Sequence, residues 1–206
     1  MPRLVRYLSH PQVRIDPAVP VPQWGLSPEG AARVAALARS GALSGTVRVV
    51  SSLETKAVET ALPLAQALGC PLQCHTVMGE NDRSATGFLP GPEFEATADA
   101  FFARPDRSVR GWETAKAAQS RIVAAVRDCL ATPDDGDLLL VGHGAVGTLL
   151  YCHLAGHPID RRFDQPAGGG NLFAFCRDTG AVSGGWQPLE TLITDPGAVS
   201  RAEPSG

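Results

Sequence analysis

The sequence has few aromatic residues, few cysteines and no excess of positive charge. Of its 206 residues, 6% are aromatic, and 18 lysines and arginines stand against 21 aspartates and glutamates, for a formal net charge of −3 at pH 7. Proteins that bind nucleic-acid backbones or anionic membranes usually carry basic surfaces that complement the phosphate charge. The charge balance therefore argues against both kinds of partner.

The five cysteines are an odd and sparse set for a chain of this length. A chain this long buries a sufficient core without disulfides, so the count favours a reducing compartment. Cys70 and Cys74 lie close to His75 in the sequence, but no second cluster follows at zinc-finger spacing. We therefore expect no metal site.

We also expect neither a secretion signal nor a membrane anchor. Its first ten residues contain no apolar stretch of signal-peptide length. The most apolar run, residues 138–156, is interrupted by His143, His153 and several glycines, which favours a strand, a turn and a helix over a membrane span. We expect a cytoplasmic protein.

Glycine and proline, by contrast, are abundant, with 22 and 17 residues. The 44% of hydrophobic and 19% of charged residues are ordinary for a globular protein, and the length predicts a single domain over residues 1–206. Prolines make residues 11–26 an extended loop. Glycines and prolines also break up residues 70–110, where we expect a cap-like insertion with a short helix near 92–103.

Strand and helix patterns alternate along the rest of the chain. Ser27 and Pro28 predict the start of the first helix, and Ser51 with Glu54 predicts a capping box at the start of the second. The apolar patterns predict strands over 4–8, 46–50, 138–141, 172–176 and 182–189, and helices over 28–40, 54–68, 112–130 and 145–154. This order is typical of an α/β fold, a three-layer α/β/α sandwich with a mostly parallel sheet.

Polar side chains follow three of the predicted strands. His10 comes after the first strand, Lys56 lies one turn beyond the second, and His143 follows the strand over 138–141. In open α/β sheets, ligands bind beyond the carboxyl ends of the strands. A single histidine in such a place is more often structural, but two histidines and a lysine at equivalent strand ends favour a reactive site.

Four segments together carry a resemblance to a known family. They are the strand that ends at His10, the segments WGLSPEG at 24–30 and SSLETKAVETA at 51–61, and LVGHGAV at 140–146. Their order and spacing resemble the histidine phosphatase superfamily, which has the phosphoglycerate mutase-like fold. The resemblance extends over residues 4–176.

The resemblance implies a role for each matching residue. His10 matches the nucleophile that attacks phosphorus and forms a phosphohistidine. His143 matches the second histidine, which as an imidazolium would hold the phosphoryl oxygens, and Lys56 stands where the family usually has a phosphate-binding arginine. Glu80 matches the acid that protonates the leaving group, with Asp82 as the alternative donor.

The sequence also departs from the family's pattern. The family's Arg-His-Gly motif is Ser9-His10-Pro11 here, so one guanidinium is missing, and a lysine at 56 offers a point charge without the bidentate geometry of arginine. We assign phosphate binding to Lys56, Ser9 and Arg14. Arg14 would replace the missing guanidinium, and Arg83 from the insertion is an alternative.

The sequence therefore predicts a phosphomonoester hydrolase that works through a phosphohistidine on a small phosphorylated metabolite or a phosphoprotein, without a cofactor. The first alternative is a catalytically weak or inactive member of the same fold that binds a phosphorylated ligand. The second is a dinucleotide-binding oxidoreductase, because residues 142–147 read G-x-G-x-x-G after a strand. This pattern lies late in the chain, and no strand ending in an acidic residue follows about 20 residues on, so the second alternative is disfavoured. The sequence determines neither the substrate nor the oligomeric state.

Overall fold

The computed structural model describes residues 3–195 and contains a six-stranded sheet in the order β3-β2-β4-β1-β5-β6. The first four strands in this order are parallel, whereas β5 is antiparallel to both β1 and β6. The strands are β1 (Leu4–Ser9), β2 (Thr46–Ser52), β3 (Leu72–His75), β4 (Asp137–Gly142), β5 (Asn171–Cys176) and β6 (Val182–Pro188). The mostly parallel sheet expected from the sequence is confirmed.

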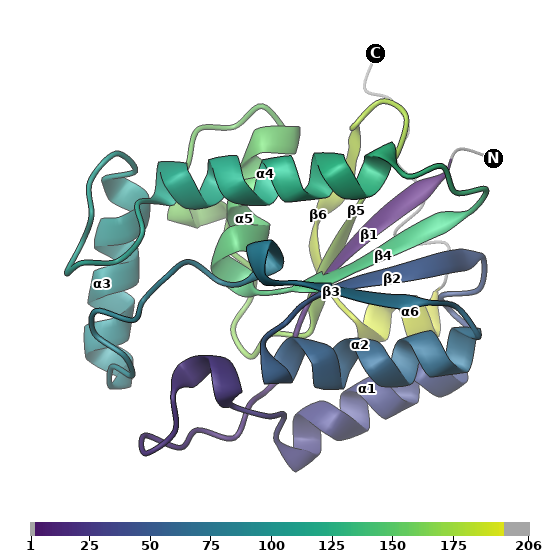
Figure 1. Ribbon diagram of the computed structural model, residues 1–206, viewed down its shortest axis with the longest axis horizontal. Helices are drawn as coiled ribbons and strands as arrows, with labels where there is room; N and C mark the ends of the chain where they lie inside the picture. Colours follow the sequence, from purple (N-terminus) through teal and green to yellow (C-terminus); the bar gives the residue numbers. More distant parts are fainter. Residues whose placement is uncertain (1–2, 196–206) are drawn as a thin grey trace.

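Helices cover both faces of the sheet, as the view in Figure 1 shows. One layer contains α1 (Pro28–Ser40), α2 (Thr55–Leu68) and α6 (Glu190–Thr194), and the other contains α4 (Ala115–Ala131) and α5 (Gly144–Leu154). The three-layer α/β/α architecture is thereby confirmed, while the short α6 escaped the sequence analysis. Within residues 3–195, every helix is too short or too polar to cross a lipid bilayer.

The central strand β4 shows why two helical layers are needed. Leu138 and Leu140 pack into the core under α4 and α5, whereas Leu139 and Val141 pack into the core under α1 and α2. All four side chains are buried. A strand that is apolar on both faces is stable only between two layers, which is how parallel sheets are usually covered.

The start of the first helix agrees with its sequence signals, but the start of the second does not. The Ser27 side chain accepts a hydrogen bond from Gly30 N, and Pro28 is the first helical residue of α1. At α2 the predicted capping box is wrong, because the N-cap residue is Glu54 and its side chain caps no helical amide. Its carboxylate is bound instead to Lys56 and to Glu80 N.

Residues between β3 and α4 leave the sheet and border its carboxyl edge. They include the 3-10 helix η2 (Thr76–Met78) and α3 (Gly91–Ala103), which stands apart from the two helical layers at the left of Figure 1. Because β3 is the edge strand of the sheet, the excursion begins at residue 76 rather than at 70. Two further 3-10 helices, η1 (Val21–Gln23) and η3 (Arg161–Phe163), lie in loops.

The parallel pairing brings three strand ends to one place. Ser9 in β1 lies opposite Gly142 in β4, and Ser51 in β2 lies opposite Val141. One residue beyond the β1–β4 ladder, His10 N donates a further hydrogen bond to Gly142 O at 2.9 Å. The segments that carry His10, Lys56 and His143 therefore start from neighbouring strands.

Candidate active site

The rings of His10 and His143 lie side by side where β1 and β4 end. Their centroids are 5.3 Å apart, and the ring planes are inclined by 70°. Two imidazoles this close disfavour each other's protonation, because both would be cations. The structure thus brings together the two histidines that the sequence singled out.

His10 is oriented by its own backbone neighbour. Its Nδ1 lies 2.8 Å from Pro11 O, and since a carbonyl oxygen only accepts hydrogen bonds, Nδ1 carries the proton and Nε2 keeps its lone pair. Burial first, and His143 second, lower the pKa of His10 to about 3. His10 is therefore a neutral imidazole near pH 7, with a nucleophilic nitrogen fixed in direction.

A glycine-rich loop holds the main chain of His10 from the other side. Gly170 N donates to His10 O at 3.0 Å, and Gly168, Gly169 and Gly170 all have positive φ angles. A Cβ on Gly169 would lie 2.3 Å from His10 O, which no real contact permits. The loop therefore requires glycine at this position for both its conformation and its close approach to His10.

His143 is fully buried and held through both its ring and its backbone. Its Nε2 lies 2.8 Å from Ser52 Oγ and 3.4 Å from a Glu54 carboxylate oxygen, while its Nδ1 has no partner within residues 3–195. The Tyr7 hydroxyl accepts from His143 N at 3.0 Å and donates to His143 O at 3.1 Å. Burial lowers the pKa of His143, and the nearby carboxylates of Glu54 and Glu80 oppose that shift.

Lys56 and Glu54 form a buried ion pair beside His143. Lys56 is 3% exposed, and its ammonium donates to a Glu54 oxygen at 2.5 Å and to Val21 O at 2.9 Å. The other Glu54 oxygen accepts from Glu80 N at 2.9 Å. Burial alone would raise the pKa of Glu54, but His143 and Lys56 outweigh it and hold the pKa at about 2.

Glu80 is placed against the start of the helix that follows His143. Its carboxylate accepts from Val146 N at 3.1 Å and from Ala145 N at 3.3 Å, both in the first turn of α5. Asp82 is exposed, and hydrogen bonds from Ser84 lower its pKa. Glu80, unlike Asp82, lines one cavity together with His10.

Arg83 brings a second cationic side chain to the site. Its guanidinium lies 5.2 Å from the ring centre of Phe94 and 5.5 Å from that of Trp112, and a guanidinium nitrogen is 3.8 Å from a Glu80 oxygen. It lines a cavity with His10 and Lys56 and another with His10 and Glu80. Stacking on two rings fixes the direction of this long side chain.

Ser9 and Arg14 are not brought to the two histidine rings by their side chains. The Ser9 hydroxyl is buried, donates to a Gln165 side-chain oxygen at 2.5 Å and accepts from Asn171 N at 3.1 Å. Arg14 is exposed and, unlike its neighbours Val13 and Ile15, lines none of the cavities at the site. Of the two arginines considered from the sequence, the structure places Arg83 near His10.

Two residues at the site escaped the sequence analysis. Glu54 was assigned to helix capping, although an acid two residues before Lys56 at a strand end was a usable signal for an ion pair. Asn81 is buried at 3% exposure, lines two of the cavities, and neither polar atom of its side chain has a partner within residues 3–195. Nothing in the sequence distinguished it from a loop asparagine.

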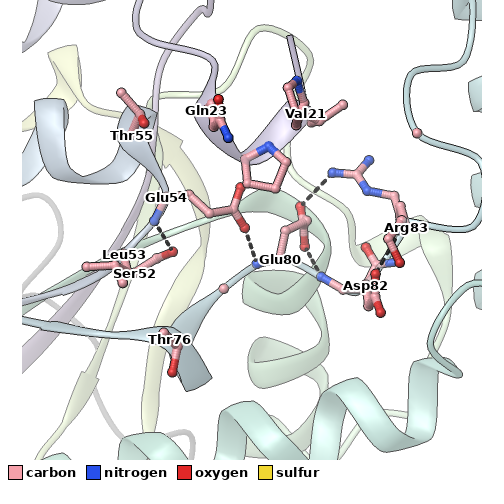
Figure 2. A pocket seen from close by; sticks show the side chains of 16 residues that line it. Val21, Gln23, Ser52, Leu53, Glu54, Thr55, Thr76, Glu80, Asp82 and Arg83 are labelled. Carbon is pink, nitrogen blue, oxygen red and sulfur yellow. Dashed lines mark hydrogen bonds and ion pairs between the residues drawn. The ribbon is translucent and has the colours of Figure 1, made fainter.

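The largest of the cavities, about 650 Å³, lies between η1 and the loop at residues 79–87. Three carboxylates line it, those of Glu54, Glu80 and Asp82, with Arg83 as the basic side chain, and we call it the acidic cavity. Figure 2 shows the Glu54 carboxylate reaching the backbone of Glu80, and the Glu80 carboxylate reaching toward Arg83. A second cavity of about 300 Å³ is lined by His10, Lys56 and Arg83 together with apolar side chains.

The glycines of the G-x-G-x-x-G pattern allow neighbouring side chains to pack directly against the backbone. A Cβ on Gly142 would lie 2.3 Å from the Tyr7 hydroxyl, one on Gly147 would lie 2.5 Å from the Tyr7 ring, and one on Gly144 would lie 2.2 Å from the Gln165 amide. Protein side chains therefore fill the space beside these glycines. Within residues 3–195, no group of His, Cys, Asp and Glu side chains is arranged to hold a metal ion, and all five cysteines are free.

Comparison with known proteins gives a family match and several similar folds. Residues 18–182 match the model of the histidine phosphatase superfamily, branch 1. No curated protein matches the sequence at a significant level.

Three solved structures illustrate the likeness of the fold. A mycobacterial glucosyl-3-phosphoglycerate phosphatase in complex with inorganic phosphate is 20% identical, with a TM-score of 0.69, over 90% of this chain and 94% of that one. YhfR from Bacillus stearothermophilus is 17% identical, with a TM-score of 0.70, over 87% and 93%. A phosphoserine phosphatase mutant from Entamoeba histolytica in complex with phosphoserine is 13% identical, with a TM-score of 0.70, over 87% and 93%. At these identities the likeness shows the fold.

The ion pair predicts a large and pH-dependent stability effect of Glu54→Gln. At pH 7 the variant leaves the Lys56 ammonium buried without a counter-ion, so we expect the free energy of unfolding to fall by about 3 kcal/mol. Because the pKa of Glu54 is about 2 in the folded protein and ordinarily 4.5, its contribution is complete above pH 4.5 and is lost as the pH falls toward 2. Urea unfolding at pH 7 and pH 3 measures the difference between wild type and variant.

The matched control for this measurement is Asp106→Asn, which breaks the pair between Lys116 and Asp106, whose side chains are 66% and 67% exposed. We expect it to cost less than about 1 kcal/mol, because solvent screens an exposed pair. Equal effects of the two variants at pH 7 would contradict the assignment of Glu54 as a buried counter-ion.

The low pKa of His10 is directly measurable. We expect the imidazole resonances of His10 to stay those of a neutral ring between pH 5 and 8, because a pKa of about 3 lies well below that range. An NMR titration of ring-labelled histidine, assigned by comparison with His10→Gln, measures it. In urea-unfolded protein the same ring should titrate near pH 6.5. A midpoint near 6.5 in the folded protein would contradict the proposed neutral state.

Proposed function

The chain belongs to branch 1 of the histidine phosphatase superfamily, and from this membership and the site geometry we propose that it hydrolyses phosphate monoesters through a phosphohistidine formed on His10. Its substrate would be a small phosphorylated metabolite or a phosphoprotein. The observation that carries the proposal is the neutral, oriented imidazole of His10 beside His143. The similar folds include phosphatases, one with bound phosphate and one with bound phosphoserine.

In the first step, the Nε2 lone pair of His10 attacks phosphorus while the bond from phosphorus to the ester oxygen breaks. A proton from Glu80 passes to the departing alkoxide, so that the alcohol leaves neutral. Lys56 and Arg83 would offset the charge on the phosphoryl oxygens, and His143 would donate a hydrogen bond to them. The products of this step are the free alcohol and phosphohistidine.

In the second step, water attacks the phosphohistidine. The N–P bond breaks, its electron pair returns to His10 Nε2, and Glu80 takes up a proton from the attacking water. Phosphate then leaves, and both residues are back in their starting states. The proposal assigns no step to a metal or a nucleotide cofactor, since Lys56 and Arg83 would supply the positive charge and His143 a hydrogen-bond donor.

Glu54 gives the second candidate function its support. A phosphoryl group that approaches Lys56 and His143 must share them with a carboxylate 2.5 Å from one and 3.4 Å from the other. This internal anion reduces the net positive charge available to the substrate. A catalytically weak or inactive member that binds a phosphorylated ligand is therefore the alternative to an efficient phosphatase.

Turnover of a generic aryl phosphate tests the proposal. Wild type should release phosphate from 4-nitrophenyl phosphate, and His10→Ala should not, because it lacks the attacking nitrogen. Denatured samples taken during turnover should contain a phosphorylated residue that is labile in acid and stable in base, as expected of phosphohistidine. His153→Ala, at the exposed end of α5, is the matched control and should turn over normally. Absence of turnover in wild type, or equal turnover in His10→Ala, would refute the phosphatase.

Removing the charge of Lys56 tests its assigned role. We expect Lys56→Met to raise KM and lower kcat, with kcat/KM reduced by about 10²-fold or more, because the transition state gains charge that the ammonium offsets. Lys56→Arg should retain turnover, since the guanidinium carries the same charge. Steady-state kinetics measures both variants.

The control separates catalysis from stability. The double variant Glu54→Gln with Lys56→Met removes both charges of the ion pair, so it should unfold at higher urea concentration than Lys56→Met alone. Its turnover should remain low. Turnover restored to the wild-type level would show that Lys56 only neutralises Glu54.

A further inference from the structure

The second cavity at His10 differs in chemistry from the acidic cavity. We call it the apolar cavity; its volume is about 300 Å³, at the lower end of the range typical of small-ligand sites. Its apolar lining comes from the loop after β1, from η1 and from the segment before and within α3, and it includes Val13, Ile15, Val21, Trp24, Phe88 and Phe94. Among residues 3–195, no carboxylate lines it, whereas three line the acidic cavity.

Aromatic rings form fixed walls of the apolar cavity. Trp24 is 8% exposed, and its indole nitrogen donates to Asp16 O and Val19 O, both at 2.9 Å, so the ring is held by the loop around it. The ring centres of Trp24 and Phe88 lie 5.6 Å apart, inclined by 56°. A flat apolar group packed against these rings gains both burial and ring contacts.

The rim of the apolar cavity exposes large hydrophobic side chains to solvent. Ile15 is 60% exposed and Phe88 36% exposed. In the part of the chain that the structure describes, Ile15 is the most exposed of the large hydrophobic residues. Exposed apolar side chains that border a hollow together are typical of a ligand-binding groove.

The inner end of the apolar cavity carries the polar groups of the candidate active site. His10, Lys56 and Arg83 line it together with the rings. An ester bound there would meet a nucleophile and two cations at its phosphoryl end and apolar walls at the other end. This separation of charge from apolar surface matches one class of substrate.

We propose that the apolar cavity binds the alcohol portion of the substrate, and that this portion is an aromatic ring esterified to phosphate. The proposal rests on the proposed phosphatase function for the reaction at His10. An alcohol that carries further carboxylates or phosphates fits neither cavity. In the apolar cavity its charge would be buried against apolar walls at a cost in free energy, and in the acidic cavity the carboxylates would repel it.

The test compares an aromatic with a small polar phosphate ester. Wild type should hydrolyse 1-naphthyl phosphate with a kcat/KM at least about tenfold higher than that for glycerol 3-phosphate. This factor is at the lower end of the substrate discrimination that apolar pockets achieve. Phe88→Ala and Ile15→Asp should each lower the ratio of the two kcat/KM values at least about threefold below that of wild type, because they remove a wall or charge the rim while the intrinsic reactivity of the aryl ester stays the same. Leu62→Ala, on an exposed part of α2, is the matched control and should leave the ratio unchanged.

Binding measurements separate this proposal from the phosphatase proposal. If neither ester is hydrolysed, calorimetric titration with the same two esters still tests the cavity. Tighter binding of 1-naphthyl phosphate by wild type, reduced in Phe88→Ala and Ile15→Asp, would support the aromatic site while the hydrolysis proposal fails. Equal affinity or equal kcat/KM for the two esters in wild type would overturn the proposal, as would an affinity ratio and a kcat/KM ratio that neither variant lowers.

Discussion

The site depends on the parallel pairing of β1 with β4. One further backbone hydrogen bond extends this pairing beyond the last residue of β1. The bond from His10 N to Gly142 O places the first residue after β1 beside the last residue of β4. Since His143 comes next, the two imidazoles meet without any side chain having to reach across the molecule. The Tyr7 hydroxyl, bound to both His143 N and His143 O, then fixes the second histidine from within β1. One strand thus positions both rings.

The charges of the site are arranged by a different constraint, the cost of burying them. Lys56 and His143 are both almost fully buried, and Glu54 provides the carboxylate that makes this burial possible. Under the proposed function, the same carboxylate would compete with a phosphoryl group for these partners. Stability of the empty site and affinity for an anion are therefore opposed at Glu54, whereas Arg83, held mainly by aromatic rings, keeps a guanidinium available.

Local signals made the framework and part of the site predictable. The alternation of strands and helices, the cap at Ser27 and the histidines at strand ends depend on short stretches of sequence, so the sheet and the proximity of His10 to His143 followed. Glu54 was misassigned because its local pattern fits a helix cap, while its actual partners come from other elements. Arg83 was named only as the alternative to Arg14, because its position depends on the rings of Phe94 and Trp112, which come together only in the folded protein.

The orientation of His10 by a carbonyl of its own chain has a consequence for how sequence variation can act on this site. No side-chain substitution removes the Pro11 carbonyl, so the hydrogen bond that orients the His10 ring does not depend on the identity of a neighbouring side chain. The position of His10 is instead sensitive to substitution at Gly169. This residue has no functional group, yet there is no room for a methyl group between it and His10 O. A residue without any functional group thus controls whether the main chain at His10 can keep its position.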